Sequence, residues 1–536
     1  NLKALFFVGA NDTLLPGNMG QGGLLTERDR EWFQKEKQAL SPGAKEKTYI
    51  QKFYLYMNLT KPEEFLHISY SKVSSDGKTL RPAYLVWDLK KLFPKLVVTE
   101  EEALLMTQRE LTPGEGLEFV IRGVRDRYLG VDESWKELYT WYRQNEGQKV
   151  DRILDAGFFK KKPDALTGEE AAELYGEKKQ FSVTRMERFS ACAYAHFLTY
   201  GLHLSDRERY EFEAMDLGNI AHQSMERFAR KAQEKRMPWP KLEEVQRDAM
   251  IEESVEESIK DYGNTVLYST ARNEYMIVRI KQLIRRSVWA LTRQMEKGDF
   301  EPSGYEMNFG SGKIDRIDTC EDEDMVYVKV TDYKTGMKSF DIVALYHGLQ
   351  MQLPVYLNAA LELEERRAPG KTVEPAGIFY YRIKDPIVDR EKDDHALEEK
   401  ILKELRLDGM INAKEEVIEH LEHQLSGTSV LNPIGKNKDG SLNRYSKVLP
   451  PEAFAAMLSY TKKKEAQVKR QIYAGEVQAN PYELNGSTGC DYCAYRDICG
   501  FDPRLDGYAY RSLEKYSKEE VIRRMEEEIE NREEPS

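Results

Sequence analysis

The sequence predicts an α/β protein with several domains. Its 536 residues correspond to about three or four domains at roughly 150 residues each. A continuous apolar run at residues 5–8 is typical of a strand buried in a parallel sheet, and alternating residues between about 304 and 335 indicate further strands. Helical patterns account for much of the rest, mainly at residues 100–180, 241–298, 395–425 and 451–475.

The composition excludes several classes of protein. Hydrophobic residues make up 40% of the chain and charged residues 32%, so the chain can form packed cores. No apolar run approaches the roughly 18 residues that span a bilayer, and five cysteines cannot form a disulfide framework, which favours a reducing, cytoplasmic setting and no membrane partner. A net charge of −12 argues against coating nucleic acid through bulk charge, although basic runs at 159–162 and 461–464 are candidate walls of a local channel.

The first hundred residues have features of their own. The apolar run begins close to residue 1 and no Met precedes it, so we expect a fragment of a longer chain. A turn follows at residues 9–12, and residues 64–71 alternate as a second strand. Residues 77–79 (Gly-Lys-Thr) resemble the end of a phosphate-binding loop, but position 72 is Lys where that loop needs glycine. The sequence therefore predicts no complete ATP site.

The most informative segment is the predicted strand at residues 326–334. Side chains alternate along a strand, so three valines of this segment share one face with Asp332 and Lys334. An apolar face that ends in two charged residues is costly to bury unless these residues pair or bind a metal. Upstream, Asp315 and Asp318 lie on opposite faces by the same parity, so only one of them can face Asp332.

Two carboxylates on neighbouring strands, with a lysine nearby, suit Mg²⁺-dependent phosphodiester hydrolysis. Carboxylates are the hard ligands that Mg²⁺ prefers, and a lysine can position the metal-activated water or balance developing charge. The simpler alternative is a salt bridge at the edge of the sheet. Two helical patterns add the candidates His222, with Glu226 one turn later, and Gln352, with Tyr356 one turn later. These four residues could instead be ordinary residues of a helix.

Three of the five cysteines cluster in one predicted loop. Cys490, Cys493 and Cys499 have the spacing Cys-x2-Cys-x5-Cys, and Cys192 lies about 300 residues earlier. Such a loop in an intracellular protein usually binds zinc or an iron–sulfur cluster. The spacing alone names neither the metal nor the fourth ligand.

Five motifs follow one another along the chain. They are Ser182-Val-Thr-Arg-Met-Glu-Arg-Phe-x2-Cys192, Gly218-x3-His222, Gly312-Lys-Ile-Asp315, Asp332-Tyr-Lys334 and Gln352-x3-Tyr356. This order resembles that of RecB-type nucleases of the PD-(D/E)XK superfamily. The four cysteines resemble the iron–sulfur staple of AddB-type subunits of bacterial helicase–nucleases. Residues 6–16 and 59–70 are similar to two late motifs of superfamily 1 helicases.

The resemblance implies a role for each candidate residue. It implies four ligands of a catalytic Mg²⁺, or of Mn²⁺ in its place: His222, Asp315, Asp332 and, through its backbone carbonyl, Tyr333. It implies that Lys334 orients or activates the water, and that Gln352 and Tyr356 support the site and the DNA strand. Asp315 and Asp332 therefore count among the catalytic residues.

The resemblance also implies a [4Fe–4S] cluster that joins the two ends of the nuclease domain. Its ligands would be Cys192, Cys490, Cys493 and Cys499, and zinc is the alternative. Cys320 falls outside this pattern, and we expect it to be an unligated thiol. His420 and His423 lie one helical turn apart among glutamates, and we interpret them as a solvated helix face.

The domain organisation follows from the same resemblance. It consists of four parts: a partial, degenerate RecA-like helicase domain at 1–100, a helical connector at 101–180, a RecB-like nuclease domain with a mixed sheet flanked by helices at 181–503, and a charged helical tail at 504–536. We expect the last dozen residues to be solvated. Where active helicases carry an arginine that contacts the ATP γ-phosphate, this chain has Lys61, so we expect no ATP hydrolysis.

The function implied is that of a DNA exonuclease subunit in a helicase–nuclease that resects double-strand breaks for homologous recombination. It would cut the 5′-terminated strand with Mg²⁺, beside an AddA-like helicase–nuclease subunit, on DNA ends and single-stranded DNA. Chi recognition would belong to the full-length subunit. The alternative is a non-catalytic DNA-recognition subunit whose nuclease has lapsed, and the intact set of His222, Asp315, Asp332 and Lys334 argues against it.

Overall fold

The computed structural model describes most of the chain. The described residues are 2–12, 14–15, 17, 30, 32–33, 35–36, 41–75, 77–100, 112–125, 133–158, 165–176, 181–205, 207, 212–262, 265–310, 312–391 and 393–530. The chain divides into two compact units, Asn1–Gly157 (unit 1) and Phe158–Ser536 (unit 2). Among the described residues, no helix has both the length and the apolar character that a membrane span requires.

Unit 1 contains two parallel strands, β1 (Leu2–Phe7) and β2 (Pro62–Ile68). Both strands begin two or three residues earlier than the apolar patterns predict. The amide nitrogen of the buried Asn11 donates to the carbonyl of Ser71 at 2.7 Å, and its amide oxygen accepts from the Ser71 N–H at 3.2 Å. One side chain therefore joins the segments that follow the two strands.

The described helices of unit 1 form two groups along the sequence. Helices α2 (Ala44–Leu59) and α3 (Tyr84–Leu92) lie in the sequence before and after β2. Three later helices, α4 (Pro113–Arg125), α5 (Glu133–Asn145) and α6 (Gly147–Gly157), pack around a small core of Val120, Tyr142 and Val150. Most described residues of the predicted connector thus belong to unit 1.

Unit 2 is built on a six-stranded mixed sheet with the order β3-β4-β5-β6-β7-β8. The strands are β3 (Glu301–Phe309), β4 (Gly312–Glu321), β5 (Met325–Lys334), β6 (Thr372–Arg382), β7 (Asp408–Asn412) and β8 (Val448–Leu449). The pairs β5–β6 and β7–β8 are parallel, and the other neighbours are antiparallel.

The region predicted as helical at residues 395–425 contains a strand. Strand β7 separates helices α15 (Asp394–Glu404) and α16 (Glu415–Leu421). The apolar part of β7 is too short for its periodicity to distinguish strand from helix, so the sequence pattern fails here.

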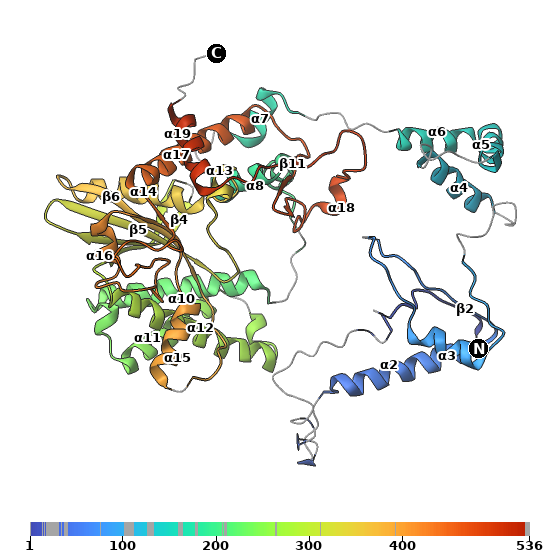
Figure 1. The fold of residues 1–536 in the computed structure, drawn as a ribbon, viewed down its shortest axis with the longest axis horizontal. Helices are drawn as coiled ribbons and strands as arrows, with labels where there is room; N and C mark the ends of the chain where they lie inside the picture. The colour runs from blue at the N-terminus through green and yellow to red at the C-terminus, as the bar shows by residue number, and fades with distance from the viewer. Residues whose placement is uncertain are drawn as a thin grey trace. The chain divides into compact units, whose positions relative to one another are not determined.

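Helices cover both faces of the sheet, which makes a three-layer α/β/α arrangement (Figure 1). One face is covered by α10 (Ala214–Glu234), α11 (Glu244–Asp261) and α12 (Ala271–Met295). The other face is covered by α7 (Gly168–Tyr175), α8 (Val183–Ala191), α13 (Ile342–Tyr346), α14 (Gln352–Arg367), α17 (Pro451–Tyr473) and α19 (Lys518–Glu530). The predicted mixed sheet flanked by helices is confirmed.

The two hydrophobic cores show the predicted alternation of β5. Val326, Val328 and Val330 lie in the core beneath α14, whereas Tyr327 and Tyr333 lie in the core beneath α10–α12. Because side chains alternate along a strand, the next residues of the valine face are Asp332 and Lys334. The strand therefore carries both charges to its end on the α14 side of the sheet.

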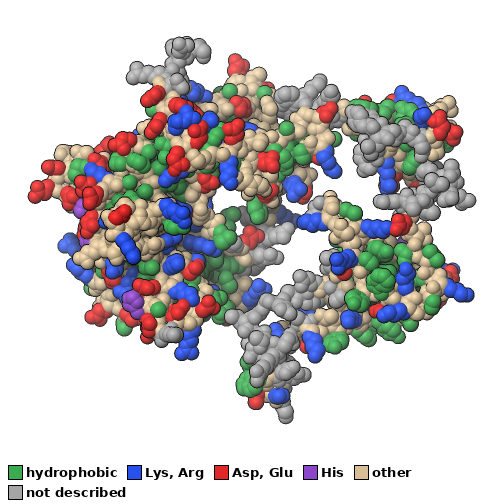
Figure 2. Space-filling model, viewed as in Figure 1, with side chains coloured by type: hydrophobic (Ala, Val, Ile, Leu, Met, Phe, Trp, Pro, Cys, Tyr) green, Lys and Arg blue, Asp and Glu red, His purple; other side chains and the backbone are tan. Residues whose placement is uncertain are grey.

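The basic run at 461–464 lies on α17 and forms no open basic wall. Lys462 pairs with Glu362 at 3.0 Å, Lys463 donates to the backbone carbonyl of Glu528, and burial lowers the pKa of Lys464. Over the visible face of unit 2, basic and acidic side chains are interspersed (Figure 2). The other predicted wall, residues 159–162, lies outside the described residues.

The C-terminal helix α19 is part of the fold of unit 2. Val521 and Met525 are buried, in the core that α13 and α17 share. The first half of the predicted solvated tail therefore continues a packed helix, and residues 531–536 lie outside the described residues.

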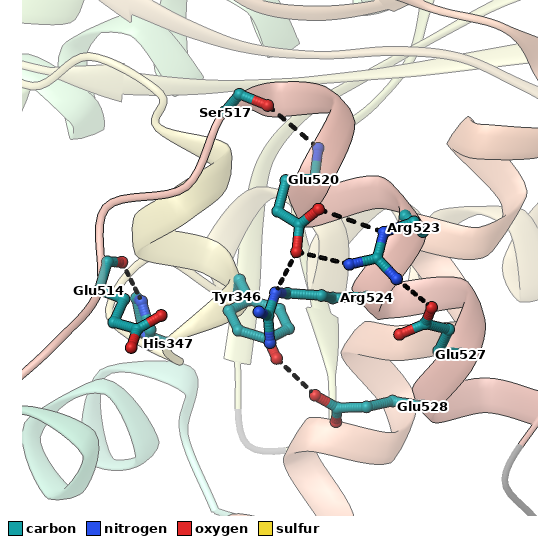
Figure 3. Close-up of polar contacts among 9 residues, drawn as sticks. All are labelled: Tyr346, His347, Glu514, Ser517, Glu520, Arg523, Arg524, Glu527 and Glu528. Atoms are coloured by element: carbon teal, nitrogen blue, oxygen red, sulfur yellow. Dashed lines mark hydrogen bonds and ion pairs between the residues drawn. The ribbon is translucent and has the colours of Figure 1, made fainter.

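Polar contacts join this C-terminal segment to α13 and the residue after it (Figure 3). The hydroxyl of Tyr346 donates to a carboxylate oxygen of Glu528 at 2.7 Å. The Nε2 atom of His347 lies 3.0 Å from the backbone carbonyl oxygen of Glu514. The segment is thus held both before α19 and near its end.

Candidate active site

The predicted catalytic residues meet at one end of the sheet, between helices from its two faces. They come from four elements: His222 from α10, Asp315 from β4, Asp332, Tyr333 and Lys334 from β5, and Gln352 and Tyr356 from α14. Helices α10 and α14, which cover opposite faces of the sheet, therefore place side chains beside the carboxylates of β4 and β5.

Asp315 is held by groups from both neighbouring elements. Its Oδ2 atom accepts the backbone N–H of Tyr333 at 2.7 Å and lies 3.2 Å from Nδ1 of His222. Both Asp315 and Asp332 are buried, with 8% and 1% of their surface exposed. The ring of Tyr333 packs in the core beneath α10–α12, where it lies edge-on to the ring of His222.

Asp332 contacts a different group with each carboxylate oxygen. Its Oδ1 atom accepts a hydrogen bond from Nε2 of Gln352 at 2.7 Å. Its Oδ2 atom lies 2.6 Å from Nζ of Lys334. Gln352 Nε2 also lies 3.0 Å from the hydroxyl of Tyr356. One amide thus joins Asp332 to Tyr356, and the lysine pairs with the other side of the carboxylate.

Glu187, on α8, fixes the start of the helix that carries Gln352. Its carboxylate accepts the backbone N–H groups of Met351 and Gln352 at 2.7 and 3.0 Å. Burial raises the pKa of Glu187, and the nearby Lys338 opposes this shift. Glu187 belongs to the first of the five sequence motifs, but its role depends on the fold, which brings α8 to the first turn of α14.

The buried charges alter each other's protonation. Burial, followed by the charge of Asp315, raises the pKa of Asp332 to about 7. Burial disfavours the charged form of His222, but the hydrogen bond and charge of Asp315 outweigh this and raise its pKa. A site that holds carboxylates against their mutual repulsion is suited to a cation.

Glu306 is a further acidic residue that the sequence analysis missed. Ligand atoms of Glu306, His222 and Asp315 all lie within 4.8 Å of one another. Lys313 Nζ lies 2.6 Å from Glu306 Oε2. Glu306 has a φ of 49°, a left-handed conformation that alternation along a strand cannot predict. Burial, followed by the charge of Asp315, raises its pKa.

Asp318 lies away from this site, as the parity of β4 predicts. Its Oδ1 atom accepts from Nε of Arg316 at 2.6 Å, and its Oδ2 atom lies 3.6 Å from Nζ of Lys329. These three charged residues form a buried group of their own. Only Asp315 of the two upstream carboxylates faces Asp332.

The four cysteines of the predicted staple line one cavity of about 230 Å³. Cys192 immediately precedes α9 (Ala193–His196), and Cys499 ends α18 (Arg496–Cys499). Cys490 and Cys493 lie in the loop that begins after strand β10. Although all four belong to the described residues, no three of their sulfurs lie within 4.8 Å of one another.

A small sheet supports the cysteine loop. Its strands are β9 (Tyr482–Leu484), β10 (Ser487–Thr488) and β11 (Arg511–Ser512), in the order β10-β9-β11. The loop leaves this sheet after β10 and the chain returns to it at β11, so both ends of the loop are held.

Hydrogen bonds join the chain around Cys192 to the chain before the cysteine loop. The N–H of Ala193 donates to Oδ1 of Asn480 at 2.9 Å, and the N–H of Tyr194 donates to the carbonyl of Gln478 at 3.0 Å. Burial raises the pKa of Cys192, so its thiol is neutral unless a metal displaces the proton.

Comparison with known proteins agrees with this arrangement. The family model of the PD-(D/E)XK nuclease superfamily matches residues 180–500. Three curated relatives are each named as the B-type subunit of an ATP-dependent helicase/deoxyribonuclease. The chain is 37% identical to the protein of Lachnoclostridium phytofermentans over 97% of this chain and 47% of the relative. It is 32% identical to that of Alkaliphilus oremlandii (99% and 49%) and 31% identical to that of Alkaliphilus metalliredigens (98% and 48%).

These matches cover nearly all of this chain but only part of each relative. The chain spans about half the length of these curated relatives, and the predicted resemblance to B-type subunits of helicase–nucleases is confirmed. The family match contains every predicted catalytic residue and all four cysteines of the staple. Because that match covers more than half of the chain, the chain belongs to the PD-(D/E)XK nuclease superfamily.

Proposed function

We propose that unit 2 hydrolyses DNA phosphodiesters with Mg²⁺, as the nuclease of an AddB-type helicase–nuclease subunit. The observation that carries this proposal is the meeting of His222, Asp315, Asp332 and Lys334 at one end of the sheet. The relatives are named as deoxyribonucleases, which supports DNA as the substrate. The completeness of this set argues against a lapsed nuclease.

The donor set fits a hard divalent cation. Asp315 and Asp332 offer carboxylate oxygens, His222 offers a ring nitrogen, and the backbone carbonyl of Tyr333 is adjacent in sequence. Oxygen donors suit Mg²⁺, and the imidazole is compatible with Mn²⁺. Burial, followed by repulsion from Asp315, raises the pKa of Asp332, and a bound cation would offset both effects. A cation held by these residues would acidify a water and stabilise negative charge on the phosphate.

The remaining residues orient these groups. Lys334, held 2.6 Å from Asp332, places a positive charge where it can hold the attacking water or balance charge on the phosphate oxygens. Gln352 keeps Asp332 in one orientation through its amide, and Tyr356 supports that amide. Glu187 in turn fixes the backbone of Gln352. The carboxylates are thereby positioned before the substrate binds.

We further propose a [4Fe–4S] cluster at Cys192, Cys490, Cys493 and Cys499. A tetrahedral zinc site with Zn–S bonds of about 2.3 Å requires sulfurs about 3.8 Å apart. The sulfurs here are more widely spaced, because no three of them lie within 4.8 Å of one another, and they surround a cavity. This spacing supports a cluster in preference to a single zinc ion.

The wider role is proposed for the whole subunit, of which this chain corresponds to about half. Unit 1 would be part of a degenerate helicase domain, without ATP hydrolysis. The subunit would act in the cytoplasm beside an AddA-like helicase–nuclease, cut the 5′-terminated strand at DNA ends, and recognise Chi in its full-length form. Such resection would prepare the break for homologous recombination.

Cleavage of single-stranded DNA tests the nuclease and its polarity together. The chain is incubated with 5′-labelled and 3′-labelled strands in Mg²⁺, in Mn²⁺ and in EDTA, with and without an AddA-like partner. We expect metal-dependent products that shorten from the 5′ end. Absence of cleavage with the partner present would contradict the proposal, and shortening from the 3′ end would contradict the polarity.

Replacing Gln352 with alanine is expected to weaken cleavage without abolishing it. The substitution removes the hydrogen bond to Asp332 Oδ1 and the support from Tyr356 but leaves every proposed ligand in place. Loss of a group that orients a metal ligand typically costs about 10–100-fold in metal affinity or activity. The measurement is the cleavage rate against Mg²⁺ concentration, with Gln246→Ala on the exposed face of α11 as the control. An unchanged Mg²⁺ dependence would refute the positioning role.

A further inference from the structure

A second group of metal-binding side chains lies at the other end of β4 from Asp315. Cys320 ends the buried part of β4, Asp299 lies just before β3, and His420 lies in the last turn of α16. One ligand atom from each of these residues lies within 4.8 Å of the other two. Cys320 follows Asp315 by five positions along the strand, which is about 16 Å. This group is therefore distinct from the candidate active site.

Two histidines converge on Asp299. Nδ1 of His420 and Nε2 of His423 each lie 2.8 Å from Oδ2 of Asp299. The other ring nitrogen of His420, Nε2, lies 3.2 Å from Oδ2 of Asp322. A carboxylate on the remote nitrogen is the contact that fixes the tautomer and orientation of metal-bound histidines. The two histidines are thus engaged by carboxylates and do not form a freely solvated face.

The backbone holds these side chains together. The N–H of Asp299 donates to the carbonyl of His420 at 2.8 Å, and the N–H of His423 donates to the carbonyl of Lys297 at 2.8 Å. A Cβ atom at Gly298 would lie 2.4 Å from the carbonyl oxygen of His420, so only glycine permits this approach. The potential ligands are therefore positioned by main-chain contacts, which lowers the cost of ordering them around an ion.

The donor types indicate which ion would bind. Cys320 is 5% exposed and belongs to the hydrophobic core beneath the site, so its sulfur lies on the buried side of the three potential ligands. A set of one thiolate, one imidazole and one carboxylate suits zinc, whereas Mg²⁺ takes oxygen ligands. We propose that Cys320, His420 and Asp299 bind a zinc ion. A water completes the tetrahedron, His423 hydrogen-bonds to Asp299, and the thiol proton of Cys320 is released on binding.

The position of this site gives it a structural role. It would connect the turn before β3, the end of β4 and the end of α16, three segments that are far apart in sequence. None of these residues contacts the proposed catalytic groups, so the zinc would stabilise unit 2 and leave DNA hydrolysis unchanged. The expectation that Cys320 is an unligated thiol is replaced by this proposal.

Zinc content and X-ray absorption test the site. The chain is loaded with zinc, dialysed, and compared with Cys320→Ser, His420→Asn and, as the matched control, His395→Asn, because His395 is 83% exposed on α15. We expect one zinc ion that both ligand substitutions remove and the control keeps. Its absorption spectrum should show one sulfur at about 2.3 Å and three nitrogen or oxygen neighbours. Cleavage of single-stranded DNA, measured in parallel, should be equal in all four proteins.

The zinc measurements on the chain and on Cys320→Ser could overturn the proposal in two ways. One is a chain that retains no zinc after dialysis, in which case the histidines and acids form only an ion-pair network. The other is zinc that persists in Cys320→Ser with sulfur neighbours alone, which would place it at the cysteine loop. Should Cys320→Ser fail to fold, Asp322→Asn leaves the three ligands intact and is expected to weaken zinc binding about 10–100-fold in a chelator competition. Unchanged affinity in that variant would also overturn the proposal.

Discussion

Replacing Asp332 with asparagine is expected to lower the rate of Mg²⁺-dependent cleavage of single-stranded DNA by at least about a thousandfold. The reason is that several kcal/mol of charge stabilisation in the transition state would depend on the bound cation. Asparagine keeps the shape of the side chain and can still accept the hydrogen bond that Gln352 donates. It removes the negative charge that pairs with Lys334 and that would bind the proposed cation. The measurement is the cleavage rate of end-labelled DNA, with EDTA as the metal-free reference.

The same substitution is expected to stabilise the metal-free protein above neutral pH. The pKa of Asp332 is about 7 in the folded protein, and about 3.9 is usual for an unfolded chain. The folded state therefore binds the proton more tightly, and stability that is present below pH 4 is lost as the pH rises through 7. The raised pKa already includes the favourable interaction with Lys334, so removing the charge relieves a cost on the order of a few kcal/mol.

Melting temperatures in EDTA check this expectation. Asp332→Asn should melt several degrees above the wild type at pH 8 and close to it at pH 4. Asp389→Asn is the matched control because the side chain of Asp389 is 99% exposed, and it should change neither cleavage nor melting. Cleavage retained by Asp332→Asn would place hydrolysis at another site. Cleavage lost together with a lower melting temperature would attribute the loss to the fold.

Replacing Cys499 with serine is expected to remove iron and sulfide from the protein and to destabilise unit 2. Cys192 and the cysteine loop are about 300 residues apart, and closing a loop of that length contributes about 6 kcal/mol in the chain-entropy model. The hydrogen bond between Ala193 and Asn480 would remain, but it must then hold the two segments without the cluster.

Iron and sulfide analysis of anaerobically purified protein, with its visible absorption and its urea unfolding midpoint, measures this effect. The wild type should be coloured, and Cys499→Ser should be colourless with a lower midpoint. Cys320→Ser is the control for the iron and sulfide content alone, because Cys320 lies outside the cavity, and it should keep its iron. A colourless wild type with zinc bound by sulfur alone would refute the cluster.

The parts of the fold that follow from local patterns could be predicted from the sequence. The alternation of β5 predicts that Asp332 and Lys334 share the face of Val330, and the cores confirm the valine face. The opposite parity of Asp315 and Asp318 is also confirmed, because Asp318 pairs with Arg316 away from the candidate site. Period and parity are properties of the strand itself, so one sequence is enough to predict them.

The missed residues depend on contacts between distant segments. Glu306 faces Asp315 because β3 pairs with β4 in a register that joins Tyr305 to Arg316 and Met307 to Ile314. Glu187 has its role because α8 meets the first turn of α14. His420 and His423 occupy a helix end whose sequence is typical of a solvated surface. Their carboxylate partner Asp299 lies more than a hundred residues earlier in the chain. No periodicity within a single segment contains that information.

The contacts around Cys192 also imply a delay during the synthesis of this protein, because they join segments that leave the ribosome at different times. Asn480, which accepts the N–H of Ala193, follows it by 287 residues. At about 5–20 residues per second, the ribosome needs roughly 14–57 s to reach the partner of a segment it has already released. During that interval the α8–α9 segment is without the chain that covers it. Nascent chains truncated before residue 480 should therefore expose Cys192 to alkylating reagents, and chains extended beyond the cysteine loop should protect it.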